Sequence, residues 1–249
     1  ADRAPIRCRN LFISLRFFHL SGCGLNLTTA DFDLVDIHTH HRENCEQGGA
    51  IRSLHVDEAA AALGGGWCSV GLHPWYLQEE AVDGQLKTLE RLLACRQVVA
   101  VGEGGLDRLA AAPMALQLCA FRAQVALSER YRLPLVIHCV KAVDELLAVR
   151  KQLRPQQPWI WHGFRGKPQQ AVQLLQQGFY LSLGEHYSAD ALRVIPADRL
   201  LLETDESACG IEVLVKRAAD VRGVGEDELR TTLRQNVRRL FFSFIIFTT

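Results

Sequence analysis

The chain has no net charge, no long apolar run and no cluster of cysteines. Lysine plus arginine and aspartate plus glutamate each number 28, so no overall field draws the protein to nucleic acid or to anionic lipid. Its eight cysteines form no C-x-x-C pair, which disfavours a thiolate metal site and a dense disulfide framework. We therefore expect reduced thiols in a cytoplasmic protein. Any anionic partner must be held by a local site.

The two ends of the chain differ in composition from the part between them. Residues 1–31 mix arginines with apolar residues, which resembles a targeting segment, but a loosely attached N-terminal extension is the simpler interpretation. Residues 243–249 are an apolar tail that either docks on the domain or is exposed. Neither end has the roughly 20 apolar residues of a membrane span, so we expect no membrane association.

Residues 32–242 alternate short β-branched runs with longer amphipathic stretches. Strands are predicted at 34–38, 51–55, 67–72, 98–103, 134–138, 158–162, 179–183 and 199–204, and helices at 81–95, 114–130, 142–153, 168–177, 211–222 and 226–241. Such alternation requires a parallel sheet, and eight strands are typical of a closed (β/α)8 TIM-type barrel in a single domain. A doubly wound open sheet is the alternative. No glycine-rich phosphate loop follows the first strand, and we expect no organic cofactor.

Side chains of metal-ligand type stand at the ends of five of these predicted strands. His38 and His40 are two residues apart, so an extended backbone points both to one face. A pair of this kind also occurs by chance on half-buried strands. In a barrel, however, all carboxyl ends of the strands converge, and five coincident strand ends are hard to explain by packing. The sequence therefore predicts a metal centre with six ligands: His38, His40, Glu103, His138, His162 and Asp205.

The motifs around these residues resemble the TatD family of metal-dependent hydrolases, within the amidohydrolase superfamily. They are DIHTH at 36–40, VGLHP at 70–74, VGEGGLD at 101–107, IH at 137–138, HGF at 162–164 and ETD at 203–205. The resemblance covers roughly residues 32–241. It implies two divalent metal ions, one held by His38, His40 and Asp205 and the other by His138 and His162, with Glu103 bridging them. It also implies that Asp205 takes a proton from water, which makes Asp205 and Glu103 the candidate catalytic residues.

Charge counting indicates what such a centre could do. Two divalent ions exceed the charge of the two carboxylates, so the site stays positive, lowers the pKa of bound water and stabilises charge on an ester oxygen. Four imidazoles and two carboxylates favour zinc; manganese and magnesium are possible.

Further polar residues are candidates for supporting roles. His73 could contact substrate or simply form a hydrogen bond in a loop. Asp36 and Glu203 could orient ligand histidines or fill the barrel as polar residues. Basic residues of the predicted mouth loops could clamp phosphate or remain solvated: Lys141, Arg165, Arg42, Arg108 and Lys167. We expect His41, His55 and His186 to be ordinary loop or strand residues.

One departure from the family pattern bears on the substrate. The family usually has an arginine two residues after the histidine of the fifth strand, and here that position is Val140. Valine cannot replace a bidentate phosphate partner. The leading hypothesis is still a metal-dependent hydrolase of DNA phosphodiesters, acting on single strands or ends. The alternatives are an amide, lactone or acyl-ester hydrolase and a non-catalytic metal-binding barrel.

Overall fold

The fold is seen in a computed structural model of the chain, which describes residues 33–46, 49–63 and 66–243. The predictions for the N-terminal extension and for the apolar tail after Ser243 lie outside the described residues.

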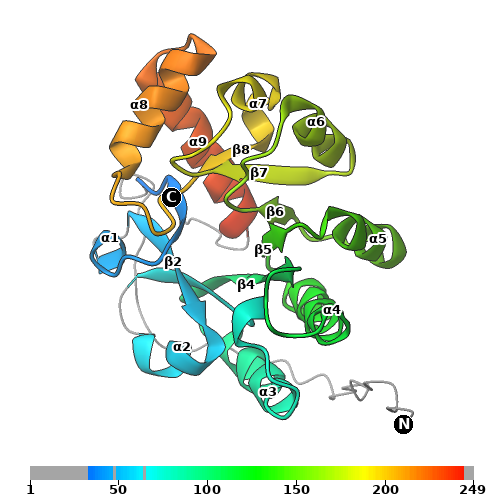
Figure 1. Cartoon of the computed structure of the whole chain (residues 1–249). Coiled ribbons are helices and arrows are strands. Elements are labelled where there is room, and N and C mark those ends of the chain that lie inside the picture. Colours follow the sequence, from blue (N-terminus) through cyan, green and yellow to red (C-terminus); the bar gives the residue numbers. More distant parts are fainter. Residues whose placement is uncertain (1–32, 47–48, 64–65, 244–249) are drawn as a thin grey trace.

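Eight parallel strands close into a barrel and follow one another in sequence order (Figure 1). The closure is made by β8 and β1, which pair through Leu202 and Asp36. The predicted (β/α)8 barrel is thus confirmed, and the open sheet is excluded because a closed sheet has no edge. The strands are β1 Asp36–Thr39, β2 Ala50–His55, β3 Trp67–Gly71, β4 Val98–Asp107, β5 Leu135–Val140, β6 Trp159–Trp161, β7 Phe179–Leu183 and β8 Leu200–Leu202.

Helices surround the strands, as Figure 1 shows. The six predicted helices are confirmed as α3 Val82–Leu92, α4 Met114–Tyr131, α5 Val143–Leu153, α6 Pro168–Gln176, α8 Ile211–Arg222 and α9 Glu226–Phe241. The structure adds α1 Glu43–Glu46, α2 Val56–Ala62, α7 Ala189–Val194 and the 3-10 turns η1 Pro74–Tyr76 and η2 Ala197–Arg199. These elements are too short to show a helical period in the sequence.

The barrel interior has an apolar lower layer and a polar upper layer. Val136, Ile160 and Leu201 belong to one buried cluster, and each precedes a polar residue of the upper layer by two positions. Since alternate residues share a face, the apolar layer lies directly below the polar one. The end of α9 closes the cluster, where the Phe242 ring packs edge-to-face on Trp67 with centroids 5.0 Å apart. The upper layer therefore stands on a tightly packed base.

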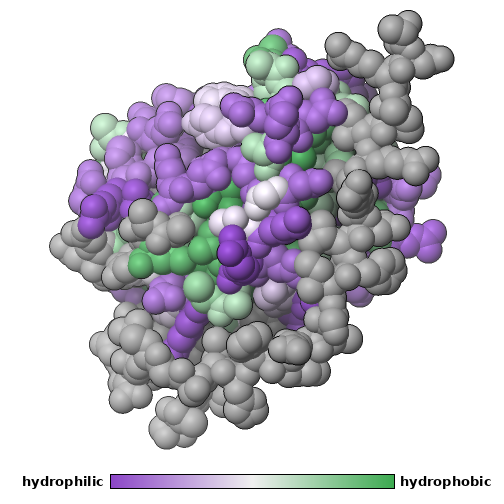
Figure 2. Space-filling view, turned by 90° about the horizontal axis from the view of Figure 1, so that it is seen from below, coloured by the Kyte–Doolittle hydropathy of each residue, from purple (hydrophilic) through white to green (hydrophobic). Residues whose placement is uncertain are grey.

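Figure 2 shows a face on which hydrophilic residues surround a smaller apolar area. Among the described residues, no helix is long and apolar enough to cross a membrane.

Five described cysteines are free thiols, namely Cys45, Cys68, Cys95, Cys139 and Cys209. The expectation of reduced thiols is wrong for Cys119, which is disulfide-bonded.

Strand β4 is longer than predicted, and a glycine shapes its middle. All ten residues of Val98–Asp107 are buried, whereas the sequence indicated an end at residue 103. The register with β5 shifts between Val101 and Gly104, and Gly102 has φ +132°, a conformation that L side chains rarely adopt. A Cβ at Gly102 would collide with the carbonyl oxygen of Val136. Glycine at this position therefore lets the strand continue past Glu103.

We predict that Gly102→Ala destabilises the protein by about 3 kcal/mol, because alanine is strained at this φ and meets the backbone of β5. Chemical denaturation followed by circular dichroism measures the change. Gly84→Ala is the matched control, since nothing lies within 4 Å of a Cβ there and Gly84 is helical. Equal stability of Gly102→Ala and wild type would contradict the role given to Gly102.

Candidate metal centre

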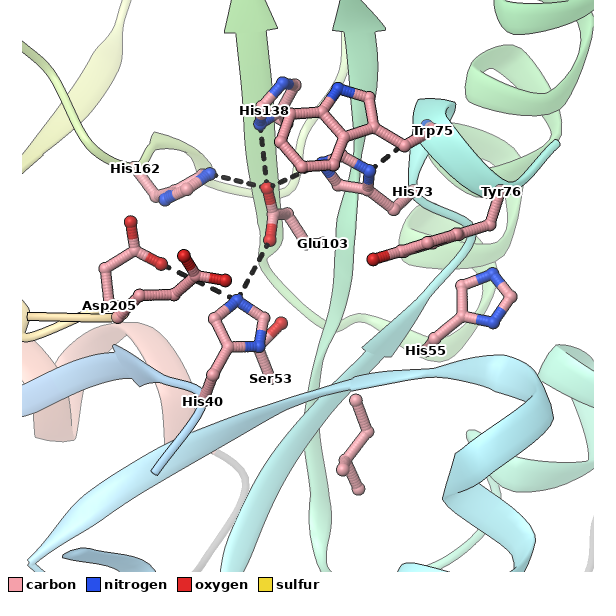
Figure 3. Close-up of a pocket in the computed structure, with 12 residues that line it drawn as sticks. His40, Ser53, His55, His73, Trp75, Tyr76, Glu103, His138, His162 and Asp205 are labelled. Atoms are coloured by element: carbon pink, nitrogen blue, oxygen red, sulfur yellow. Dashed lines mark hydrogen bonds and ion pairs between the residues drawn. The ribbon is translucent and has the colours of Figure 1, made fainter. Parts of the chain in front are cut away.

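The carboxylate of Glu103 lies at the centre of a ring of histidines at the carboxyl ends of the strands (Figure 3). Its Oε1 is 2.7 Å from His162 Nε2, 2.8 Å from His138 Nδ1 and 3.1 Å from His73 Nε2. These imidazoles come from the loop after β6, from β5 and from the loop after β3. One carboxylate oxygen thus faces three rings from three different segments.

The other oxygen of Glu103 faces a second set of side chains. Its Oε2 is 3.3 Å from His38 Nε2 and 3.7 Å from His40 Nε2. Oδ1 of Asp205 completes this side, at 3.7 Å from His38 Nε2 and 3.6 Å from His40 Nε2. The structure therefore brings all six predicted ligands together, in two groups that meet at Glu103.

Backbone contacts fix Asp205 beside the end of β1. Its N–H donates to the His38 carbonyl at 2.9 Å, and its carbonyl accepts from the His40 N–H at 3.1 Å. Asp205 has φ +54°, in the left-handed region that aspartate tolerates better than most residues. The chain turns out of β8 at this point, so the carboxylate comes to lie against the two histidines.

The donors fit divalent metal ions. Within the described residues, several sets of donor atoms lie within 4.8 Å of one another, among them His38 with His40 and Asp205, and His38 with Glu103 and His162. Neither ring nitrogen of the buried His38 has a hydrogen-bond partner of good geometry among these residues. A buried polar atom without a partner is costly, and a bound cation would satisfy it. Imidazole and carboxylate donors suit transition metals such as zinc and manganese.

The carboxylates and imidazoles of the cluster shift one another's pKa values. Burial raises the pKa of the Glu103 carboxyl, but the surrounding imidazoles, His162 first, hold it well below its usual value. Burial lowers the pKa of His162, yet the carboxylates of Glu103 and Glu203 raise it well above the usual value. The pKa of His40 is also raised, chiefly by its hydrogen bond to Glu103. A cation must therefore compete with protons at these imidazoles, and binding weakens as the pH falls.

Glu203 and Asp36 support the cluster in different ways. Glu203 Oε1 accepts from the Gly163 N–H at 2.5 Å and lies 3.3 Å from His162 Nδ1, so it orients that ring. Asp36 forms no hydrogen bond to a histidine ring of the described residues and instead accepts from the backbone N–H of His38 and from the hydroxyl and N–H of Thr204. Burial raises the pKa of Asp36 to about 7. Its role is to tie β1 to the end of β8.

The sequence analysis did not identify Asp107. It ends β4, where its Oδ2 lies 3.1 Å from His138 Nε2 and accepts from the Trp75 indole N–H at 2.6 Å. Asp107 thereby orients His138 from the side opposite Glu103. Because residues 103, 105 and 107 share a strand face, the alternation would have indicated this role had β4 been predicted at its full length.

A cavity of about 140 Å³ opens over the cluster. Its lining adds six residues that were not predicted as site residues: Ser53, Leu54, His55, Trp75, Tyr76 and Glu206. His55, expected to be an ordinary strand residue, ends β2 and forms part of this wall. His73, the candidate substrate contact, also lines the cavity.

A second cavity, of about 210 Å³, lies on the other side of Asp205. Arg165 and His186 line it, and Asp205 and Glu206 line both cavities. Lys141 is exposed and lies outside the described linings of both. The guanidinium of Arg108 pairs with Glu145. Of the basic mouth residues, Arg165 is the one that the linings of these two cavities include.

Comparison with known proteins identifies similar sequences and folds. The model of a family described as TatD related DNase matches residues 46–242. A protein of Erwinia tasmaniensis named 3'-5' ssDNA/RNA exonuclease TatD is 30% identical, over 88% of this chain and 98% of that protein. Deoxyribonuclease Tat-D of Schizosaccharomyces pombe is 32% identical over 57% of this chain and 52% of that protein. Among solved structures, the TatD homologue YJJV of Escherichia coli has a TM-score of 0.71 and 25% identity, over 84% of this chain and 98% of that one.

We predict that Glu203→Gln lowers the pKa of His162 toward the ordinary histidine value, because one of the two carboxylates that raise it loses its charge. Titration of the histidine ring protons by NMR, with a chelator present, measures this pKa. Glu185→Gln, which removes a carboxylate charge outside the cluster, is the control. An unchanged His162 pKa in Glu203→Gln would show that Glu203 does not act on that ring.

Proposed function

The chain belongs to the TatD-related DNase family of metal-dependent nucleases, and we propose that it hydrolyses phosphodiester bonds of single-stranded DNA, at an end of the strand, with two divalent ions. The observation that carries this proposal is the division of the cluster at Glu103, whose two oxygens face separate sets of donors. One carboxylate shared between two donor sets is what a bridging ligand requires.

Each ion would be held by one set of donors. We assign His38, His40 and Asp205 to the first ion. His138 and His162, which both face Glu103 Oε1, are assigned to the second, with Glu103 contacting both. The nitrogen-rich donor set favours zinc, and manganese or magnesium are the alternatives. When bound, such ions would activate water as a nucleophile and stabilise negative charge on the phosphodiester oxygens.

Asp205 is the best-placed proton acceptor of the cluster. Its side chain is 27% exposed and lines both cavities, whereas that of Glu103 is 8% exposed. Water that reaches either cavity can therefore approach the Asp205 carboxylate. Asp205 would take the proton of the attacking water, and Glu103 would hold its charge fixed between the histidines.

His73 is proposed as a hydrogen-bond donor to substrate. Its Nδ1 accepts from the Trp75 N–H at 3.2 Å, and burial lowers its pKa, so the neutral ring carries its proton on Nε2. That nitrogen points to Glu103 Oε1 and into the cavity. It can stabilise Glu103 in the free enzyme and donate to a phosphate oxygen that enters.

Arg165 is the proposed contact for the phosphate next to the cleaved bond. It lines the cavity beyond Asp205, and a guanidinium binds phosphate by two parallel hydrogen bonds. Lys141 would touch a more distant part of the strand. Arg165 would thereby supply one guanidinium beside the cluster without the arginine that Val140 replaces, in a cavity that Glu185, Glu203 and Glu206 also line.

We predict that the protein supplied with zinc or manganese cleaves single-stranded DNA and that a chelator abolishes cleavage. His138→Ala should reduce the rate by about 100-fold or more, since loss of even an outer partner of a metal ligand costs 10–100-fold. Elemental analysis should find fewer ions in this variant than in wild type.

His41→Ala is the matched control for His138→Ala, because His41 Nε2 contacts the Ser207 carbonyl instead of Glu103. It should keep the metal content and most of the activity. Absence of metal-dependent cleavage by the wild type, together with hydrolysis of neutral amides or esters, would instead support the wider superfamily's chemistry.

We predict that Arg165→Ala weakens binding of single-stranded DNA more than Lys141→Ala does. The slope of the logarithm of the binding constant against that of the salt concentration should fall by about one in Arg165→Ala, as for the loss of one phosphate contact. Fluorescence anisotropy with a chelator present measures both quantities without cleavage. Equal effects of the two substitutions would contradict the role given to Arg165.

A further inference from the structure

Two large aromatic side chains at the cavity mouth are exposed to solvent. Trp75 is 58% exposed and Tyr76 is 56% exposed, and they are the aromatic residues among the large apolar side chains found exposed in the described part of the chain. Both line the cavity that also contains Glu103 and Asp205. Exposed aromatic surface next to a reaction centre indicates a binding site for a ligand with its own apolar face.

Trp75 and Tyr76 are held in fixed positions. They lie in η1, which begins at the buried Pro74 after His73; the Tyr76 N–H donates to the His73 carbonyl at 3.1 Å. The indole N–H of Trp75 donates to Asp107, and the His55 ring packs edge-on against Tyr76 with centroids 5.1 Å apart. A ligand that stacks on these rings would therefore lose little affinity to ordering of the protein.

The two rings also lie close to the metal centre. The Trp75 ring centroid is 5.1 Å from that of His73 and 6.0 Å from that of His138, and both histidines contact Glu103. Figure 3 shows Trp75 and Tyr76 on the side of the cavity away from Asp205. A phosphate at the cluster thus has an aromatic surface on one side and the Arg165 cavity on the other.

We propose that Trp75 and Tyr76 form the stacking platform for the nucleobase adjacent to the cleaved phosphodiester. This inference rests on the proposed function, since it takes the phosphate at the cluster to be part of a nucleic acid strand. Each base that stacks on an aromatic ring raises the binding affinity by a large factor, and all four bases can stack in this way. Such stacking favours an unpaired base, because the internal bases of a duplex already stack on both neighbours. The platform would thereby select single strands without reading their sequence.

The test compares the binding of two short strands by fluorescence anisotropy with a chelator present, namely an oligothymidylate and a strand of the same length made of abasic nucleotides. Wild type should bind the oligothymidylate about tenfold more tightly or better. Tyr76→Ala and Trp75→Ala should lose most of this preference, and their affinity for the abasic strand should stay near that of wild type. Tyr76→Phe and Trp75→Phe should keep the preference, because a phenyl ring still stacks.

The control variants separate stacking from support of the cluster. Trp75→Phe loses the hydrogen bond to Asp107 but keeps an aromatic face, so a loss of preference in this variant would assign the effect to Asp107 and His138. Equal losses for both strands, or equal affinities of wild type for them, would overturn the inference. Cleavage is scored separately. A base preference that depends on Trp75 and Tyr76, without metal-dependent cleavage, would support the platform and refute the proposed function.

Discussion

The structure depends on one buried carboxylate, that of Glu103, surrounded by imidazoles from several segments of the barrel. A charged carboxylate in a barrel interior is costly unless its oxygens are satisfied, and here five histidines lie within 3.7 Å of it. Such an arrangement needs segments that converge from all sides, which the carboxyl ends of a closed barrel provide. It also needs a strand that reaches far enough, and Gly102 lets β4 do so. The closed barrel and the length of β4 are therefore both needed to form the site.

The positions of the main site residues could be predicted because they follow from periodicity. Strand ends are marked where apolar runs stop, and in a parallel barrel these ends meet on one face, so His38 and Asp205, 167 positions apart, could be predicted as neighbours. The division of donors between the two oxygens of Glu103 does not follow from periodicity, and only the resemblance to the TatD family implied it. This division depends on side-chain positions that differ by a few ångströms, and the residue types alone do not predict such positions.

The parts that were missed share a physical cause. The end of β4 was predicted too early because the glycines of GEGGLD are typical of a loop. In the structure this segment is buried and continues the strand. As a result Asp107 and its contact with His138 were not seen. The 3-10 turn with Trp75 and Tyr76 is three residues long and has no periodic pattern. The exposure of these two aromatic residues could not be predicted, because it depends on which side chains the folded chain covers.

The neighbours of Val140 in the barrel show what an arginine at this position would contact. It pairs in register with Asp107, and alternation puts both side chains on the same face of adjacent strands. An arginine at position 140 would therefore lie beside the Asp107 carboxylate. In this chain that carboxylate accepts the indole N–H of Trp75, which fixes an aromatic ring at the place where a guanidinium would otherwise add charge. In the proposed mode of binding, this edge would rely on stacking, and Arg165, across Asp205, would contact phosphate. Since stacking is nearly insensitive to salt and phosphate pairing is not, the two sides of the site would then contribute to affinity in physically separable ways.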